Sequence, residues 1–420
     1  MIITNAPKGT ADVLPSESYR WHAAENIAKD TAKVFGFNEI RTPSFEHTGL
    51  FLRGVGGTTD VVQKEMYTFE DKKCRSVTLK PEGTSGVVRA VLEHGLLSGR
   101  FPLPLKAFYF TPCFRYEAPD SGRLREHHQF GAEVFGTYAP NADAEVILLA
   151  KTVLQKAGID DAELFINSIG CPKCRESYLK TLIKYYTPLV DKLCGVCRDR
   201  LHRNPMRLLD CKVDECKRLG ENAPVMLDCL CDDCQTHFDG VKTLLTAFGI
   251  DYKINLRIVR GLDYYTNTVF EFIPIGGGAT LCGGGRYNGL VEQIGGEPTG
   301  GVGFGMGIER LLAELERKGT PPGEPYRPSV YLVSTDSEAA IVAAKLTNEI
   351  RRLGIIAECD ISGRSLKAQM KHADKIRSLH TLVVGSNEIE SGKAKLKRMS
   401  DGTTMDVTLT ASDITKSIII

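Results

Sequence analysis

The sequence has few of the features that mark a secreted, membrane-bound or strongly charged protein. Its formal net charge is only +1, so no global basic or acidic field surrounds it. No segment approaches the roughly 18 consecutive apolar residues of a membrane span. Residues 1–15 have neither a basic start nor an apolar stretch, so we expect no signal peptide. We therefore expect a cytoplasmic protein without membrane association, in which local basic groups would bind any nucleic acid.

Cysteine, in contrast, is abundant and unevenly placed. The chain has 13 cysteines, of which nine lie between Cys171 and Cys234. An odd number of cysteines without a signal peptide argues against a secreted disulfide framework. Reduced thiols in a metal-binding segment are the better interpretation.

The spacing within this segment indicates zinc. Two Cys-x2-Cys pairs, CPKC and CGVC, are separated by 19 residues, which is the spacing of a zinc ribbon. The later cysteines, including those of CLCDDC, are less regular. The pairs can also interleave, and the alternative is a set of reduced free thiols. We predict one Zn²⁺ site on Cys171, Cys174, Cys194 and Cys197, and a second possible site on Cys211, Cys216, Cys231 and Cys234.

A chain of 420 residues is too long for one ordinary core and predicts two or three domains. The composition changes sharply at the cysteine-rich segment, which we assign to an insertion over residues 169–238. Residues 1–168 and 239–320 would then be two parts of one core. A Pro/Gly-rich linker at 319–328 leads to a β-α-β-α pattern, which predicts a small α/β domain over 328–420.

Two segments, FRYE and QFGAEVF, predict a β-hairpin with one polar face. Strand side chains alternate between faces, so Arg115 and Glu117 share one face. By the same rule Gln129 and Glu133 share a face of the second strand. The loop between the strands adds Arg123. The alternative is an ordinary solvated face of an antiparallel sheet.

Glycines alternate with apolar residues over 301–307, in the sequence GVGFGMG. Such a strand has one bare face and one apolar face, and glycine in a strand often marks the close approach of a ligand or another backbone. A planar base could lie on this floor, with Arg310 at its end where a helix begins. Met306 stands where a dinucleotide fingerprint needs its third glycine. The alternative is a close contact between strands.

Two further segments carry polar groups at the ends of predicted elements. RGLDYYTNTVFEF places Arg260, Tyr264 and Tyr265 before a strand, and TLKPEGTSGVVRA places Glu82 and Thr84 at the entry to a helix. Each segment alone is also typical of a surface turn or a capped helix.

Together these segments resemble the class II aminoacyl-tRNA synthetases. FRYE with its arginine loop resembles motif 2, GVGFGMGIERLL resembles motif 3, and TPSFEHTGLF resembles the dimer-forming motif 1. RGLDYYTNTVFEF, KGTADVLP, PEGTSGVVRA and HHQFGAEVFG resemble the histidyl-tRNA synthetases over almost the whole chain. The resemblance implies an α+β catalytic core with an antiparallel sheet flanked by helices. It also implies a C-terminal α/β anticodon-binding domain and a homodimer formed through motif 1.

The resemblance also implies the reaction, which is ATP-dependent activation of histidine to histidyl-adenylate and transfer to the 3′ end of tRNA(His). Mg²⁺ would accompany ATP. By resemblance Arg115 contacts the α-phosphate, Arg310 the γ-phosphate, and Arg123 the folded triphosphate. Arg260 would neutralise the substrate carboxylate and α-phosphate, and Glu117 would assist at the adenine end. Since a carboxylate is already an anion, the reaction needs positioning and charge neutralisation rather than a general base.

Recognition of histidine requires polar groups matched to an imidazole ring. Glu133 can accept a hydrogen bond from a ring N–H, and Tyr264 can pair with the other nitrogen. The resemblance assigns the rest of the amino acid site, around the amino group and carboxylate, to Glu82, Thr84, Gln129 and Tyr265.

The C-terminal region carries a basic stripe, formed by Lys367, Lys371 and Lys375 at helical spacing. Such a stripe suits a phosphate backbone, although a solvated helix face has the same pattern. Two rival functions remain: a regulatory subunit of the first enzyme of histidine biosynthesis, which resembles this catalytic domain, and a class II synthetase for another amino acid. The presence of a C-terminal domain and of the motif arginines argues against the first rival.

Overall fold

The computed structural model divides the chain into two compact units, Met1–Gly323 and Glu324–Ile420, and the division falls within the Pro/Gly-rich segment 319–328. Part of the motif 2 loop and the residue before Arg260 lie outside the described residues. In the part of the chain that is described, no helix is both long and apolar enough to cross a membrane. The structure describes all residues except 1–4, 57–58, 60, 119–122, 259 and 420.

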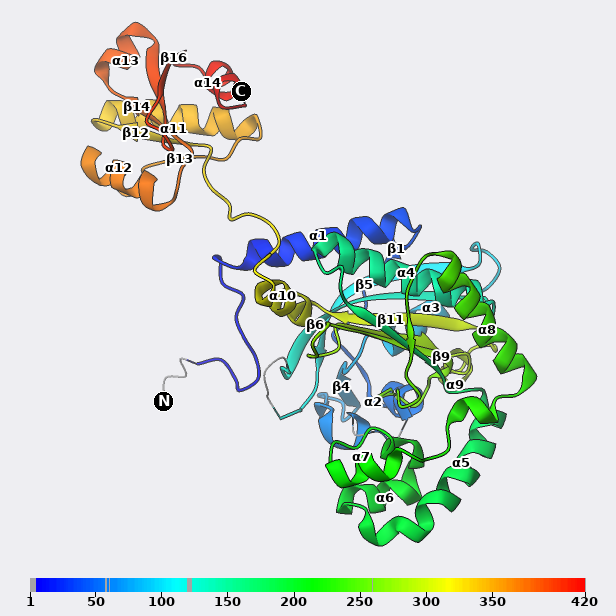
Figure 1. The fold of residues 1–420 in the computed structure, drawn as a ribbon. Helices are drawn as coiled ribbons and strands as arrows, with labels where there is room; N and C mark the ends of the chain where they lie inside the picture. The colour runs from blue at the N-terminus through cyan, green and yellow to red at the C-terminus, as the bar shows by residue number, and fades with distance from the viewer. Residues whose placement is uncertain (1–4, 57–58, 60, 119–122, 259, 420) are drawn as a thin grey trace. The chain divides into compact units, whose positions relative to one another are not determined.

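An eight-stranded mixed sheet organises the first unit (Figure 1). Neighbouring strands are antiparallel except at the two edges, where β1 pairs with β5 and β7 with β8 in parallel. The predicted hairpin is present as β5 and β6, with Phe114 opposite Glu126. In spatial order the strands are β1 (Asn38–Glu39), β5 (Leu105–Phe114), β6 (Glu126–Phe135), β11 (Gly301–Gly307), β10 (Cys282–Arg286), β9 (Thr266–Ile273), β7 (Glu163–Ser168) and β8 (Lys253–Ile254).

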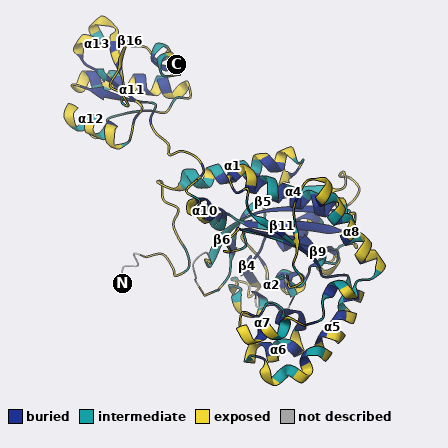
Figure 2. Cartoon of the chain, viewed as in Figure 1, coloured by how far each residue is buried: buried dark blue, intermediate teal, exposed yellow. Residues whose placement is uncertain are grey.

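One face of this sheet is apolar and packs against helices. On β6, Phe130, Ala132 and Val134 enter this core, while Gln129 and Glu133 point to the other face, as the alternation of a strand requires. Figure 2 shows the central strands buried and the outward sides of the helices exposed. The helices of this layer are α1 (Ser18–Val34), α4 (Pro140–Ala157), α8 (Asp232–Ala247) and α10 (Ile308–Arg317).

Several shorter helices and strands belong to the segments that reach the opposite face of the large sheet. Helix α3 begins at Thr84, directly after the strand that ends before Pro81, as the sequence predicts. Phe45 and Phe69, on two strands of a small antiparallel sheet, are about half exposed. These elements are β2 (Phe45–His47), β3 (Thr68–Glu70), β4 (Ser76–Leu79), α2 (Thr48–Phe51), α3 (Thr84–Glu93), α9 (Leu290–Ile294) and two π-helical turns, Leu52–Gly56 and Val61–Glu65.

The cysteine-rich insertion is a group of short helices between β7 and α8. Figure 1 shows α5, α6 and α7 together at the end of the first unit that is remote from α1. Its small core contains Tyr178, Tyr186 and several cysteines. The helices are α5 (Pro172–Tyr186), α6 (Gly195–Arg203) and α7 (Asp214–Gly220), joined by the 3-10 segments η3 (Thr187–Lys192), η4 (Pro205–Leu208) and η5 (Met226–Cys229).

The second unit is a five-stranded sheet with helices and has its own core. Its order begins β-α-β-α, in agreement with the sequence, and the helices α13 and α14 are additions to the predicted pattern. Lys367, Lys371 and Lys375 are exposed on α12, on the side away from buried Gln369 and Ala373. The elements are β12 (Val330–Ser334), α11 (Ser337–Arg352), β13 (Ala357–Cys359), α12 (Leu366–Lys375), β14 (His380–Val384), α13 (Ser386–Ser391), β15 (Lys393–Arg398), β16 (Thr404–Thr408) and α14 (Ala411–Ile419).

Candidate active site

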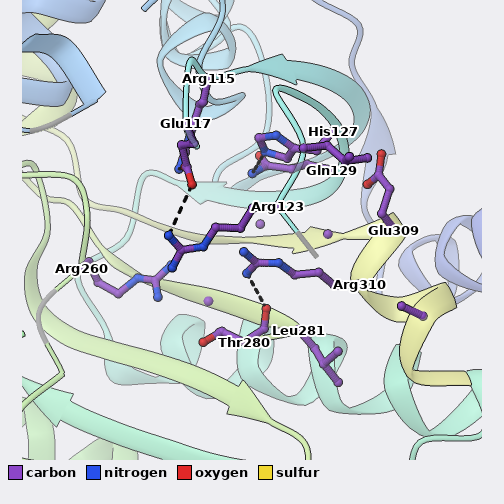
Figure 3. Close-up of a pocket in the computed structure, with 15 residues that line it drawn as sticks. Arg115, Glu117, Arg123, His127, Gln129, Arg260, Thr280, Leu281, Glu309 and Arg310 are labelled. Carbon is purple, nitrogen blue, oxygen red and sulfur yellow. Dashed lines mark hydrogen bonds and ion pairs between the residues drawn. The ribbon is translucent and has the colours of Figure 1, made fainter. Parts of the chain in front are cut away.

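A cavity of about 440 Å³ lies on the glycine-bearing face of the large sheet (Figure 3). It is formed where β5 ends, β6 begins, and β11 passes into α10. Its walls are polar and mostly positive, whereas its floor has little side-chain bulk. The described residues that line it are Arg115, Glu117, Arg123, Leu124, His127, Gln129, Arg260, Thr280, Leu281, Gly283, Gly305, Gly307, Glu309, Arg310 and Ala313.

Four arginines converge on this cavity from different parts of the chain. Arg115, just past β5, donates from Nε to the Pro81 carbonyl at 2.8 Å, and Arg310 donates from Nη1 to the Thr280 carbonyl at 2.8 Å. Arg123 lies 3.7 Å from the Glu117 carboxylate. Burial, followed by the charges of Arg123, Arg115 and Arg260, lowers the pKa of Arg310. Such a concentration of guanidinium groups is typical of a phosphate-binding site.

Arg260 is partly buried and is paired with Glu271 on β9. Burial lowers its pKa, but the Glu271 carboxylate more than compensates, and the pKa of Arg260 is raised. A side chain at Gly283 would overlap the Arg260 guanidinium. Gly283 of β10 therefore provides the space through which Arg260 reaches the cavity.

The start of β6 contributes two histidines, His127 and His128, whose surroundings differ. Burial, then Arg115 and Arg310, lowers the pKa of His127 to about 3, so its ring in the cavity wall is neutral near pH 7. His128 is held by Glu309, which accepts from its backbone N–H at 2.9 Å and contacts its Nδ1 at 2.9 Å. Glu309 thereby joins the beginning of β6 to the first turn of α10.

A second polar group lies on the same sheet face and is enclosed by protein. Glu133, at its centre, is fully buried and accepts hydrogen bonds from Thr84 Oγ1 at 2.8 Å, Tyr109 OH at 2.9 Å and Tyr287 OH. Burial raises the pKa of Glu133 to about 8 despite these donors. We call this group the buried carboxylate cluster; its members are Glu82, Thr84, Tyr109, Glu133, Tyr264, Tyr265 and Tyr287.

Glu82 attaches the cluster to helix α3. Its carboxylate accepts the backbone N–H groups of Thr84 at 2.6 Å and Ser85 at 2.8 Å, which satisfies free donors at the helix start. Tyr264 OH donates to Glu82 at 3.5 Å. The Tyr264 ring packs against Tyr265, with centroids 4.7 Å apart. The predicted cap at the start of α3 is thus also part of the cluster.

The glycine stripe of β11 serves both polar groups. Gly305 and Gly307 line the cavity, in agreement with a floor for a ligand. At Gly303, a side chain would overlap the Glu133 carboxylate, and at Gly301 it would overlap the Tyr287 ring. Half of the predicted floor is therefore covered by the protein's own side chains.

The predicted site residues thus fall into two neighbouring groups. Arg115, Glu117, Arg123, Gln129, Arg260 and Arg310 line the cavity, while Glu82, Thr84, Glu133, Tyr264 and Tyr265 belong to the buried carboxylate cluster. Tyr109, Tyr287 and Glu271 were not predicted from the sequence. The available signal for Tyr109 was Gly131 on the other strand of the predicted hairpin, and the structure places the two opposite each other, where a glycine permits the close approach of a large side chain.

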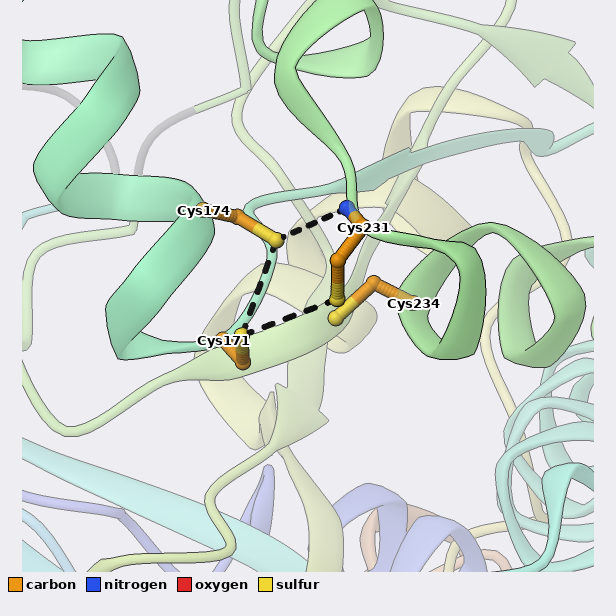
Figure 4. Close-up of side chains that lie close together, drawn as sticks. All are labelled: Cys171, Cys174, Cys231 and Cys234. Atoms are coloured by element: carbon orange, nitrogen blue, oxygen red, sulfur yellow. Dashed lines mark hydrogen bonds between the residues drawn. The ribbon is translucent and has the colours of Figure 1, made fainter.

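Eight of the nine cysteines between Cys171 and Cys234 form two groups of four, but not the predicted groups. The first cysteine cluster consists of Cys171, Cys174, Cys231 and Cys234 (Figure 4), and the second of Cys194, Cys197, Cys211 and Cys216. The predicted set of Cys171, Cys174, Cys194 and Cys197 is wrong as a grouping, and so is the second possible set of Cys211, Cys216, Cys231 and Cys234. The interleaved alternative is the one found. The reason is that the start of α8 returns to the start of α5, which places CPKC beside the end of CLCDDC.

Each cluster has the chemistry of a metal site. In each, the four sulfur atoms lie within 4.8 Å of one another. Burial opposes ionisation, yet backbone N–H groups and neighbouring thiols lower the pKa of Cys171 to about 7, and that of Cys194 likewise to about 7. Thiolates are the form that binds metals, so both clusters could hold a metal ion.

Comparisons with known proteins agree with these observations. The sequence model of a family described as histidyl-tRNA synthetase matches residues 9–173 and 222–311, and an anticodon binding domain matches 329–418. The unmatched stretch 174–221 lies in the insertion. A histidine–tRNA ligase of Clostridium novyi is 54% identical over 99% of both chains, and one of Acetivibrio thermocellus is 51% identical over 97% of this chain and 98% of the relative.

Solved structures share the fold. The apo histidyl-tRNA synthetase of S. aureus superposes with a TM-score of 0.83 at 36% identity, covering 99% of this chain and all of the other. A structure from Bacillus halodurans, titled as an ATP phosphoribosyltransferase regulatory subunit/histidyl-tRNA synthetase, has a TM-score of 0.66 at 20% identity over 92% of this chain and 99% of the other. At that identity the second likeness concerns the fold alone.

Proposed function

Because the chain belongs to the histidyl-tRNA synthetase family, we propose that the arginine-lined cavity and the buried carboxylate cluster together activate histidine with ATP. The chain is a class II aminoacyl-tRNA synthetase that forms histidyl-adenylate and transfers the histidyl group to tRNA(His). One observation carries the proposal. Four arginines converge on a cavity whose described lining residues include no serine, cysteine or lysine.

That composition fits a reaction in which the substrate supplies the nucleophile. A carboxylate oxygen of histidine forms a bond to the α-phosphorus of ATP, and the bond from that phosphorus to the pyrophosphate oxygen breaks. No proton must be removed from the attacking group. The protein's contribution is then to align the two anions and to neutralise the charge that increases at the phosphoryl oxygens.

The arginines divide this work according to their positions. Arg260, which packs over Gly283 of β10, neutralises the histidine carboxylate and the α-phosphate. Arg115 binds the α-phosphate, and Arg310, in the first turn of α10, binds the γ-phosphate. Arg123 is the most exposed of the four and closes over the triphosphate, while Glu117 assists at the adenine end.

The buried carboxylate cluster selects the imidazole ring. In its ionised form, the Glu133 carboxylate has about four acceptor positions. Three donors already contact Glu133, which leaves about one position for a ring N–H. Tyr264 pairs with the other ring nitrogen. Around the amino group and carboxylate of histidine we place Glu82, Thr84, Gln129 and Tyr265.

Mg²⁺ would enter with ATP and offset the charge of its phosphates. Magnesium takes oxygen ligands, and the described carboxylates that line the cavity are Glu117 and Glu309. Glu309 is hydrogen-bonded to His128, and Glu117 is paired with Arg115 and Arg123, so either carboxylate would bind the metal only by exchanging these partners.

We propose that the metal of each cysteine cluster is zinc. A tetrahedral Zn²⁺ with four sulfur ligands at about 2.3 Å has sulfur–sulfur edges of about 3.8 Å. The Sγ atom of Cys171 lies 3.6 Å from that of Cys174 and 4.0 Å from that of Cys231. The Sγ atoms of Cys194 and Cys211 are 3.9 Å apart. Zinc in these positions would hold the insertion together.

The assembly we propose is a cytoplasmic homodimer that binds tRNA(His) through two regions. The motif 1 region exposes Phe45, which a partner subunit would cover. The exposed lysines of α12 would contact the phosphate backbone near the anticodon. Sedimentation of the purified chain tests the dimer.

Histidine-dependent exchange of pyrophosphate into ATP tests the proposed reaction. The purified chain should catalyse exchange with histidine and not with the other amino acids. Exchange with another amino acid alone would refute the specificity. Histidine binding without any exchange would favour a regulatory protein of the same fold.

A further inference from the structure

The first cysteine cluster lies against the segment that carries the proposed histidine-binding tyrosines. We call residues 260–267 the recognition loop, because Arg260, Tyr264 and Tyr265 belong to it. The cluster contains the two points where the insertion leaves and rejoins the core: Cys171 and Cys174 at the start of α5, and Cys231 and Cys234 at the start of α8 (Figure 4).

Asn267 connects the loop directly to this cluster. Its side-chain Nδ2 donates to Cys234 Sγ at 3.4 Å. Its backbone N–H donates to the Gly170 carbonyl at 3.0 Å, and its carbonyl accepts the Ile169 N–H at 2.8 Å. Its φ of 50° lies in the left-handed region, which asparagine tolerates better than most residues. The end of the loop is thus attached to the residues that lead into Cys171.

Arg175, the residue after Cys174, provides a second connection. Its guanidinium donates from Nη2 to the Tyr265 carbonyl and from Nη1 to the Asp263 carbonyl at 3.4 Å. Arg175 Nε is buried without a hydrogen-bond partner, so the guanidinium is held in place by the loop carbonyls. Any rotation of the first turn of α5 would therefore displace the backbone on both sides of Tyr264.

The second cysteine cluster has contacts of another kind. Cys194 donates its backbone N–H to Cys216 Sγ at 3.4 Å and approaches Cys211 at 3.9 Å, and these contacts stay inside the insertion. The nearest links from this part of the insertion to the loop are side chains of η4 and its cap, Arg207 to Gly261 and Asn204 to Asp263. They do not involve a cysteine.

We infer that the first cysteine cluster, when it holds its metal, positions the recognition loop and so controls the affinity for histidine. Asn267 and Arg175 are the positioning residues. The second cluster stabilises the insertion without this control. Loss of the first metal, by chelation or by oxidation of its thiols, would weaken histidine binding more than ATP binding, because Arg260 is the one loop residue that we assign to the nucleotide. The inference depends on the proposed function, because it assumes that the loop binds histidine.

The test uses the full-length chain and three variants. C231S/C234S removes two ligands of the first cluster, C211S/C216S removes two ligands of the second, and Asn267→Gly removes only the amide link. Glycine keeps the left-handed conformation at position 267 without strain. Zinc per chain is measured by atomic emission, and the dissociation constants of histidine and ATP are measured by calorimetry.

We expect two zinc ions in the wild-type chain and one in each double cysteine variant. Histidine binding should weaken by about ten-fold or more in C231S/C234S, as two attachments of the loop are lost, and by about five-fold in Asn267→Gly, the effect of one hydrogen bond. ATP binding should weaken less than histidine binding in C231S/C234S and Asn267→Gly, because Arg260 is the one loop residue assigned to ATP, and it should be unchanged in C211S/C216S. C211S/C216S should bind histidine as the wild type does.

Several results would overturn the inference. A wild-type chain that binds histidine but holds no zinc would do so, as would unchanged histidine affinity in both C231S/C234S and Asn267→Gly. Equal weakening in the two double cysteine variants would show a general effect of the insertion. If C231S/C234S does not fold, Asn267→Gly decides alone. A wild-type chain without histidine binding would instead refute the proposed function.

Discussion

The arginine-lined cavity and the buried carboxylate cluster lie on one face of the same sheet, but their charges are compensated differently. In the cavity, four arginines outnumber the carboxylates beside them, so positive charge remains for an incoming anion. In the cluster, Glu82 and Glu133 accept hydrogen bonds from hydroxyl and backbone N–H donors, and no arginine or lysine of the described residues is hydrogen-bonded to either carboxylate. A nucleotide brings its own negative charge, whereas an imidazole ring is neutral or weakly basic. The positive charge of the cavity therefore complements the phosphates of its proposed ligand, and the polar groups of the cluster complement an imidazole ring.

Arg260 joins the two halves, and its removal should have the largest effect. Arg260→Ala is expected to lower the rate of histidine-dependent exchange by about 10³-fold, because it removes a buried cation next to the reacting phosphate. Steady-state exchange kinetics measure this loss.

Arg257→Ala is the matched control, since Arg257 is exposed and nearby in the sequence. Glu271→Gln controls for the carboxylate that Arg260 leaves unpaired. Near-normal exchange in Arg260→Ala would contradict the assigned role.

Glycine substitutions distinguish the two halves by packing. Gly303→Ala should destabilise the fold by about 1–3 kcal/mol, because its methyl group would overlap the Glu133 carboxylate. At Gly305 the nearest atom is Gln129 Oε1 at 3.3 Å, the end of a flexible side chain in the open cavity. Gly305→Ala should therefore fold nearly normally but bind ATP less well. Thermal unfolding of the two variants tests this, and equal stability would show that the cluster is loosely packed.

The buried carboxylate predicts a pH effect on stability. Burial raises the pKa of Glu133 from 4.5 to about 8, so the folded chain holds a proton there that the unfolded chain releases. The resulting stabilisation is complete below about pH 4.5 and is lost as the pH rises through about 8. Glu133→Gln cannot titrate at this position, so its free energy of unfolding should fall less than the wild type's over that range. Parallel pH profiles of the two proteins would exclude the buried titration.

The smallest effect is expected at the rim of the cavity. Arg123 has a side chain that is 57% exposed, and its one described ion pair is a 3.7 Å contact with Glu117. Arg123→Ala should raise the KM for ATP by about ten-fold or less and leave the KM for histidine unchanged. A change confined to histidine would mean that the two halves are not separable.

The sequence anticipated the local features of this site better than its long-range contacts. Alternation correctly placed Gln129 and Glu133 on one face of β6, and Pro81 with Glu82 correctly marked the entry to α3. The predicted grouping of the cysteines was wrong, because the spacing of cysteines along the chain does not determine which segments the fold brings together.

The sequence by itself determined the class of the protein through its motifs, the alternating faces of its strands, and the division at its Pro/Gly-rich segment. These features depend on residues close together in the chain, where spacing alone sets direction. The tertiary structure decided which cysteines meet, that Tyr109 and Tyr287 reach Glu133, and that Asn267 contacts Cys234. Those contacts join segments tens to hundreds of residues apart, and only the path of the folded backbone brings them together.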